Sequence, residues 1–163
     1  MIKVLSIAGS DPSGGAGIQV DLKTFQALNA FGMVVPAALT FQNSKGVTGA
    51  EPVATRVLAR QLEVLFSDIR PDAVKTGMLL TKQSVAAAAG SVKRHKIRSV
   101  IVDPIIRSST GRSLLTPDGV DALKKLLFPL ALLVTPNIPE AELLSGFGIV
   151  TGEDMDYAAG KLL

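Results

Sequence analysis

Short apolar runs rich in β-branched residues alternate along the chain with segments whose apolar residues recur every three or four positions. The first pattern is typical of buried strands, and the second is typical of helices that pack one face on a sheet. Strands are expected at residues 3–8, 33–40, 73–76, 100–102 and 132–134. Helices are expected at residues 18–29, 53–66, 81–93, 117–127 and 139–144. This alternation predicts an α/β sandwich with a mainly parallel sheet.

Turn and capping residues set the expected element boundaries. Pro36 is expected to break the second strand, and the polar residues 42–49 are expected to form a turn. Thr116 before Pro117 is typical of a helix start, and Gly146 is typical of a helix end.

The last segment of the chain has the pattern of a helix that stops before its pattern is complete. Thr151 begins a helical segment whose apolar residues continue to Leu163 without a glycine cap or a following strand. We therefore expect residues 1–163 to form a single domain that is incomplete at the C-terminus.

Polar residues and glycines gather directly after the expected strands. They are the glycine-rich segment 9–17, Gln42, Asn43, Gly77, Asp103 and Asn137. In open parallel sheets the carboxyl ends of the strands form the ligand crevice, so these residues predict a binding site at that edge.

Composition excludes several classes of protein. Hydrophobic residues make up 47% and charged residues 19%, which is typical of a globular chain. A net charge of +3 with 4% aromatic residues offers neither a basic tract nor stacking platforms for nucleic acid. There is no cysteine, which excludes disulfides, thiolate nucleophiles and zinc-finger sites. The one histidine, His95, fits a surface residue better than a base and offers little for a Ser-His-Asp or multi-histidine metal site. Without a signal-peptide pattern or a membrane-length apolar run, the sequence predicts a cytoplasmic protein that binds no membrane.

The glycine-rich segment 9–17 matches neither the Walker A spacing nor G-x-G-x-x-G. Its glycines let a ligand approach the backbone, and the following helix N-terminus favours polar or anionic groups. A tight turn that needs positive φ angles explains the same residues equally well.

Each remaining candidate has a functional and a structural interpretation. Asp21 can accept hydrogen bonds from a substrate or lie on the surface, and Gln42 can pair with a heterocycle edge or belong to a turn. Asp103, Asn137 and Glu140 form an oxygen-rich set suited to Mg²⁺, although Asn137 and Glu140 also fit a helix cap.

Five motifs in order resemble the hydroxymethylpyrimidine/phosphomethylpyrimidine kinases of thiamin biosynthesis. They are residues 7–24 (IAGSDPSGGAGIQVDLKT), 42–47 (QNSKGV), 75–79 (KTGML), 102–104 (VDP) and 135–142 (TPNIPEAE). The resemblance covers essentially the whole chain. It implies the three-layer α/β/α sandwich of the ribokinase-like superfamily, of which this chain is the N-terminal portion.

The resemblance also implies a function and a set of site residues. ATP and Mg²⁺ are the expected cofactors for phosphorylating 4-amino-5-hydroxymethyl-2-methylpyrimidine and its monophosphate. A homodimer is the expected assembly. Asp103 and Glu140 are expected to bind or orient Mg²⁺, and Asn137 is expected near the nucleotide phosphates. The pyrimidine pocket is assigned to Gly9, Asp21, Gln42, Met78 and Ile105.

Two departures from the family pattern change this expectation. Ser109 stands where the family commonly has a lysine, and Arg107 is a candidate to replace that charge. The family continues into K-G-G-H and G-T-G-C-T segments that carry its catalytic cysteine, so no catalytic residue is expected in this chain and it is expected to be a poor kinase. Pyridoxal or pyridoxine kinase activity and a non-catalytic ligand-binding fragment remain the alternatives.

Overall fold

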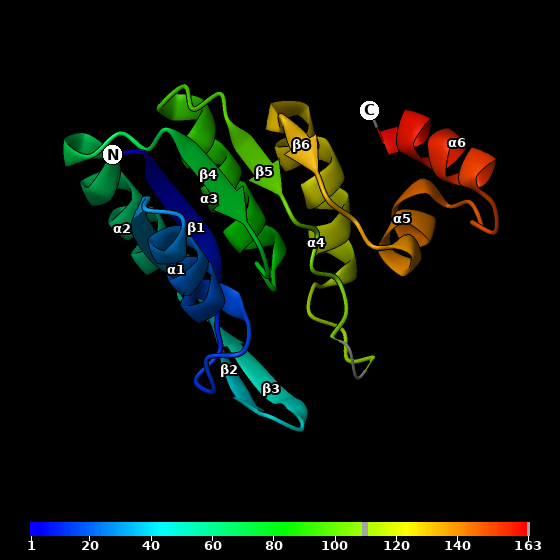
Figure 1. Cartoon of the computed structure of the whole chain (residues 1–163), viewed down its shortest axis with the longest axis horizontal. Helices are drawn as coiled ribbons and strands as arrows, with labels where there is room; N and C mark the ends of the chain where they lie inside the picture. The colour runs from blue at the N-terminus through cyan, green and yellow to red at the C-terminus, as the bar shows by residue number, and fades with distance from the viewer. Residues whose placement is uncertain (109–110, 163) are drawn as a thin grey trace.

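A six-stranded sheet forms the centre of the computed structural model, which describes residues 1–108 and 111–162. The strand order is β3-β2-β1-β4-β5-β6, and all neighbouring strands are parallel except β2 and β3 (Figure 1). The α/β fold with a mainly parallel sheet is thereby confirmed. The strands are β1 (Lys3–Ser10), β2 (Phe31–Asn43), β3 (Gly46–Pro52), β4 (Ala73–Thr76), β5 (Val100–Val102) and β6 (Leu133–Val134).

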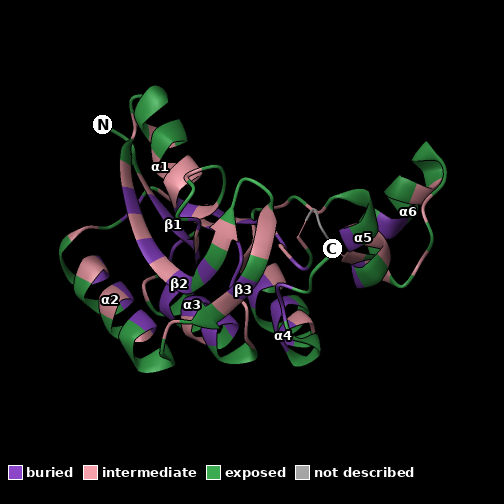
Figure 2. Ribbon diagram, turned by 90° about the horizontal axis from the view of Figure 1, so that it is seen from below, coloured by how far each residue is buried: buried purple, intermediate pink, exposed green. Residues whose placement is uncertain are grey.

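Helices cover both faces of the sheet. Helix α1 (Gly17–Ala27) lies on one face, and α2 (Thr55–Asp68), α3 (Lys82–Arg94) and α4 (Pro117–Ala122) lie on the other (Figures 1 and 2). Helices α5 (Ile138–Ser145) and α6 (Gly152–Leu162) lie beyond β6. Among the described residues, no helix combines the length and apolar character needed to cross a membrane.

The hydrophobic core lies mainly between the sheet and the layer of α2, α3 and α4. Figure 2 shows buried residues on the strands and on the helix faces turned toward them. Removal of their apolar surface from water is the main stabilising contribution to this packing. The fully buried core side chains include Leu5, Ile7, Leu58, Leu62, Val74, Val85, Val92 and Val100.

Strand β2 and its partner β3 differ from the expectation. Residues 42–49 were expected to be a turn, but β3 begins at Gly46 and pairs antiparallel with the end of β2. Pro36 does not break β2, because the pairing with β1 shifts there: Ala8 lies opposite Pro36, whereas Gly9 lies opposite Ala38. A bulge of this kind accommodates a residue that cannot donate a backbone hydrogen bond.

Local signals fixed several helix ends as expected. The Thr81 hydroxyl caps α3 by accepting a hydrogen bond from the Ser84 amide, and Gly146 ends α5 at a φ of +69°. The helix expected over residues 117–127 is regular only to Ala122 and continues as a wider π-type turn over Leu123–Leu127.

Candidate functional site

The glycine-rich loop between β1 and α1 is held in shape by its own aspartate. Asp11 is buried, and its carboxylate accepts hydrogen bonds from the Ser13 amide, the Ser13 hydroxyl and the Gly15 amide. Desolvation alone would raise the pKa of Asp11, but these hydrogen bonds outweigh it and lower the pKa. These hydrogen bonds hold the turn of the loop together from within it.

Two glycines of this loop have close neighbours, one a backbone atom and the other the end of a flexible side chain. Gly17 has a φ of +58°, and a Cβ there would lie 2.3 Å from the carbonyl oxygen of Gly9. A Cβ on Gly9 would lie 2.7 Å from the Cε of Met78. The tight-turn interpretation is therefore correct for Gly17, whereas the bare backbone of Gly9 makes room for the Met78 side chain.

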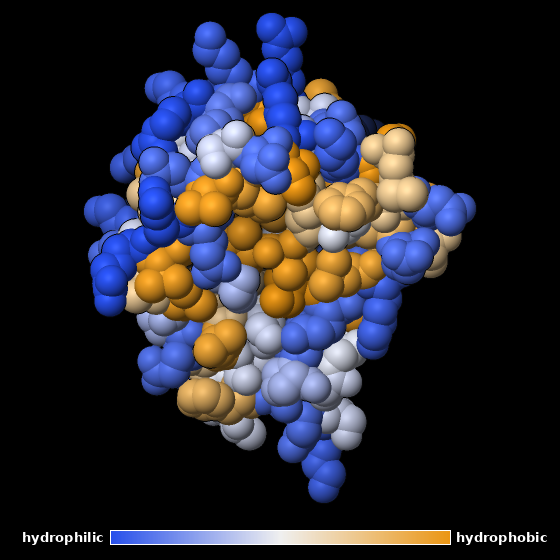
Figure 3. Space-filling view, turned by 90° about the vertical axis from the view of Figure 1, so that its left-hand side faces the viewer, coloured by the Kyte–Doolittle hydropathy of each residue, from blue (hydrophilic) through white to orange (hydrophobic). Residues whose placement is uncertain are grey.

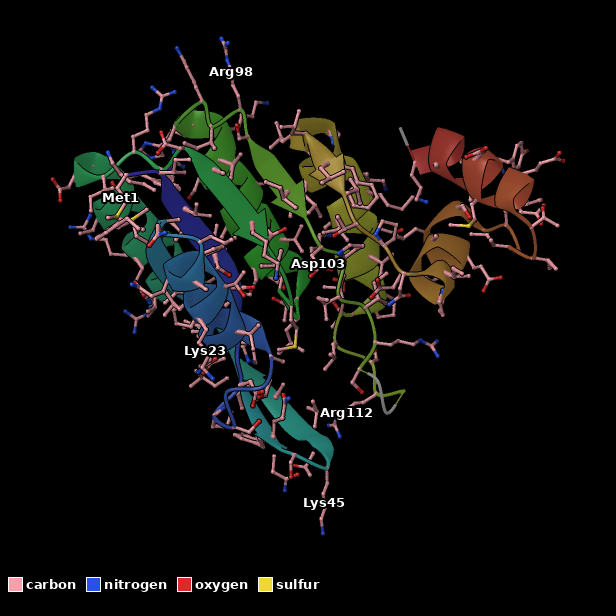
Figure 4. The ribbon with its side chains drawn as sticks, in the orientation of Figure 1. Met1, Lys23, Lys45, Arg98, Asp103 and Arg112 are labelled. Carbon is pink, nitrogen blue, oxygen red and sulfur yellow. The ribbon has the colours of Figure 1, made fainter. Side chains whose placement is uncertain are left out.

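A cavity of about 360 Å³ opens at the carboxyl ends of β1, β4 and β5. Figure 4 shows Asp103 just past the end of β5, on the side of the molecule where the β2–β3 hairpin projects. Five residues expected in the pyrimidine pocket line this cavity together with Asp103. They are Gly9, Asp21, Gln42, Met78 and Ile105.

Ionic contacts cross the floor of this cavity. The Lys75 ammonium lies 3.0 Å and 3.3 Å from the two carboxylate oxygens of Asp21, and 3.4 Å from one oxygen of Asp103. The Ser6 hydroxyl donates a further hydrogen bond of 2.5 Å to Asp21. Asp21, one turn into α1, is thereby fixed with its carboxylate toward the sheet.

Gln42 and Met78 present two kinds of surface to the cavity. The single proton of the Thr40 hydroxyl is within donating distance of two oxygens, the Ser10 carbonyl at 2.8 Å and Oε1 of Gln42 at 3.2 Å, so Thr40 lies between β1 and the Gln42 amide. Met78 is almost fully buried and offers a polarisable apolar surface. An amide beside an apolar wall suits a flat heterocycle with polar edges.

A second hollow of about 850 Å³ lies beside the first, and Arg107 lines both. Asn137 and Glu140 line it at the start of α5, where they form a capping box: the Asn137 side chain accepts from the Glu140 amide, and Glu140 accepts from the Asn137 amide. The other oxygen of Glu140 accepts a hydrogen bond of 3.1 Å from the Ile106 amide. The structural interpretation of this pair is therefore correct, and both residues nevertheless face the hollow.

Asp103 and Glu140 are both carboxylates with raised pKa values. Burial is the main cause for Asp103; Lys75 opposes it, and the charge of Asp21 adds to it. Burial also raises the pKa of Glu140, against the hydrogen bonds from the Ile106 and Asn137 amides, and the charge of Asp103 contributes. The charge of Asp103 thus disfavours the ionised form of Glu140, as burial does.

The residues present fit Mg²⁺ of the kind that is bound together with phosphates. The described residues contain no group of three or more histidine, cysteine or acidic side chains that could enclose a metal ion. Mg²⁺ is commonly held by one or two carboxylates, with water and substrate phosphates completing its coordination. Asp103 and Glu140 supply that number of carboxylates.

Sequence reasoning gave no role to several polar residues of the first cavity, among them Lys75 and Thr40. Lys75 belongs to the 75–79 motif, but the sequence assigns it no function, and Thr40 is expected only as part of a strand; both line the cavity. Asp21 and Asp103 are two negative charges expected at the same edge of the sheet, and the cation needed between them could have pointed to Lys75. Nothing in the sequence marks Thr40. The departure at Ser109 lies outside the described residues; Arg107, the candidate to replace the missing charge, lines both hollows.

Comparisons with known proteins agree with this geometry. The family model described as phosphomethylpyrimidine kinase matches residues 11–163. The chain is 45% identical to the hydroxymethylpyrimidine/phosphomethylpyrimidine kinase of Bacillus subtilis (strain 168) over 161 residues, which are 99% of this chain and 59% of that protein.

Two solved structures are similar over 99% of this chain. The phosphomethylpyrimidine kinase from Clostridium difficile 630 has a TM-score of 0.92 and 42% identity, with 70% of its own chain covered. The pyridoxal kinase from Staphylococcus aureus in complex with AMP-PCP and pyridoxal has a TM-score of 0.87 and 40% identity, with 58% covered.

The chain thus spans about three fifths of the Bacillus subtilis relative. The family model nevertheless extends over nearly all of this chain. This chain belongs to the phosphomethylpyrimidine kinase family.

Proposed function

We propose that the protein carrying this chain transfers the terminal phosphate of ATP to 4-amino-5-hydroxymethyl-2-methylpyrimidine and then to the resulting monophosphate. The observation that carries this proposal is the cavity of about 360 Å³ in which an amide, a carboxylate and an apolar side chain converge. A volume of this order suits one substituted pyrimidine ring.

The lining residues have distinct roles in the proposed complex. Asp21 accepts a hydrogen bond from the hydroxymethyl group, because its oxygens keep acceptor capacity beyond their bonds to Ser6 and Lys75. The amide of Gln42 pairs with the ring edge, and Met78 packs on the ring face. Gly9 and Ile105 complete the pocket as backbone and apolar surface.

The neighbouring hollow is proposed to receive the nucleotide phosphates. Asn137 lies at the N-terminus of α5, whose amide groups favour a negative charge nearby. Asp103 and Glu140 are proposed to bind or orient Mg²⁺, which would supply charge neutralisation for the transferred phosphate when bound. The protein's own contribution is to hold the hydroxymethyl group beside that hollow and to exclude water around it.

Binding and turnover together test this function. Calorimetric titration with the hydroxymethylpyrimidine and with pyridoxal should show that the pyrimidine binds at least about tenfold more tightly, which is about 1.4 kcal/mol. A coupled ADP-release assay with Mg²⁺-ATP should rank the two compounds in the same order. Preference for pyridoxal would favour pyridoxal kinase activity, the alternative that the Staphylococcus aureus structure supports.

We further propose that the protein works in the cytoplasm, where ATP is available, as a homodimer. Strand β2 pairs with β3 only from Ala38 onward, so one edge of its first half carries no strand. Figure 3 shows hydrophobic side chains gathered across this side of the molecule. Val57 and Val64 of α2 are exposed and line a hollow together with Val34 and Val35 of β2, and Phe31 is exposed at the start of β2. Light scattering of the parent chain and of Val64→Glu tests this: the parent should be dimeric and the variant monomeric.

A further inference from the structure

One lysine connects the two carboxylates of the first cavity. Lys75 extends from β4, and its ammonium contacts both oxygens of Asp21 and one oxygen of Asp103. The Lys75 and Asp103 side chains are about one quarter exposed, at 26% and 27%, and that of Asp21 is 12% exposed. The contacts therefore lie at a partly desolvated position, where charges interact more strongly than at the surface.

The two contacts of Lys75 are unequal. Asp21 is held through both oxygens and by the Ser6 hydroxyl, whereas Asp103 has a single, longer contact of 3.4 Å. Within the described part of the chain, no other cation forms an ion pair with either carboxylate. Without Lys75, Asp21 and Asp103 would share one cavity as like charges with no counter-ion between them.

We propose that Lys75 is a positioning residue that fixes Asp21 for the substrate hydroxyl by neutralising its repulsion from Asp103. This inference rests on the proposed function, because it takes Asp21 as the group that meets the hydroxymethyl end of the pyrimidine. Lys75 itself needs no contact with the substrate. Because Asp103 has only one contact with Lys75, of 3.4 Å, it can bind another cation while Asp21 stays held by the Lys75 ammonium and the Ser6 hydroxyl.

Lys75 is proposed to act through its charge, so the loss of pyrimidine affinity on replacing Lys75 should depend on whether residue 103 is charged. Lys75→Met keeps most of the side-chain length but removes the ammonium. We expect it to weaken binding of the hydroxymethylpyrimidine by at least about tenfold in the parent chain. With Asp103→Asn already present there is no opposing carboxylate, and the same substitution should weaken binding by no more than about threefold.

Calorimetry of the parent chain, the two single variants and the double variant measures this difference directly. Equal losses in the two backgrounds would show that Lys75 acts through packing, and no loss in either would remove it from the site; both results overturn the inference. A parent chain that does not bind the pyrimidine would instead overturn the proposed function, before any substitution is compared.

Two controls keep the comparison interpretable. Lys93→Met removes an exposed lysine of α3 outside the cavity, and it should leave the affinity for the pyrimidine unchanged. Circular dichroism should show that each variant is folded. Lys75→Gln, which keeps a donor without a charge, provides the same test in both backgrounds if Lys75→Met does not fold.

Discussion

Gly17 is the position at which one added methyl group should disturb the site most. Its φ of +58° disfavours any residue with a side chain, and the new Cβ would lie 2.3 Å from the carbonyl oxygen of Gly9. Real Cβ atoms essentially never approach another heavy atom closer than 3.0 Å, so the backbone of β1 or of α1 has to move. Gly17→Ala therefore combines conformational strain with a steric clash.

The magnitude follows from these two contributions. A left-handed conformation costs an alanine about 1–2 kcal/mol. Displacement of packed backbone adds about 1–3 kcal/mol. We expect Gly17→Ala to lower the free energy of unfolding by about 2–5 kcal/mol, measured by urea denaturation with circular dichroism.

Gly146 provides a matched control for the strain alone. Its φ of +69° is similar, but a Cβ there meets no atom within 4 Å. Gly146→Ala should cost only about 1–2 kcal/mol. If the two variants lose the same stability, the carbonyl of Gly9 is not a fixed obstacle and the argument for a rigid loop is wrong.

Further predictions concern individual polar groups. Gln42→Ala should weaken hydroxymethylpyrimidine binding roughly ten- to a hundredfold in calorimetry, because a lost buried hydrogen bond costs about 1–3 kcal/mol; unchanged affinity would contradict the assignment. In the full-length protein, Asp103→Asn should raise the Mg²⁺ concentration needed for half-maximal ADP release, and a metal dependence equal to that of the parent would contradict its role. Asn137→Ala should lower the free energy of unfolding by about 0.5–2 kcal/mol, and with it the melting temperature, because it removes the cap of α5. An unchanged melting temperature would show that this cap does not stabilise the fold. The pKa of Asp11 is lowered in the folded state, so its contribution to stability is present above its ordinary pKa of 3.8 and is lost as the pH falls through the folded value. The difference in free energy of unfolding between the parent and Asp11→Asn should therefore shrink over that pH window. A difference that does not change with pH would contradict this assignment.

The short buried strands were the elements most easily predicted from sequence. Residues 73–76 and 100–102 were predicted with the bounds observed, because the first ends at Gly77 and the second is an apolar run that ends at Asp103. Strand β3 was missed because Gly46–Pro52 is mostly polar or small and half exposed, so it lacks the alternation by which a strand is recognised. Its pairing depends on the neighbouring end of β2, which a local pattern does not contain.

The residues of the candidate site were easier to predict from sequence than the hydrogen bonds and ion pairs among them. The motifs named residues that line the cavity, and most of these lie at or just after the carboxyl end of a strand. The bonds among them are long-range: Lys75 and Asp21 are 54 residues apart, and Glu140 bonds an amide 34 residues earlier. Such pairs follow from how the strands are ordered in the sheet, which the sequence pattern alone leaves open.

The position of Glu140 has a consequence for redesigning substrate preference. One of its oxygens accepts a hydrogen bond from the Ile106 amide and the other accepts one from the Asn137 amide, so Glu140 links the segment after β5 to the start of α5. Ile105, next to Ile106, is part of the pyrimidine cavity wall. A substitution that shifts the first turn of α5 therefore changes the shape of that wall from outside it, and a library aimed at new ring substituents should vary this turn as well as the lining residues.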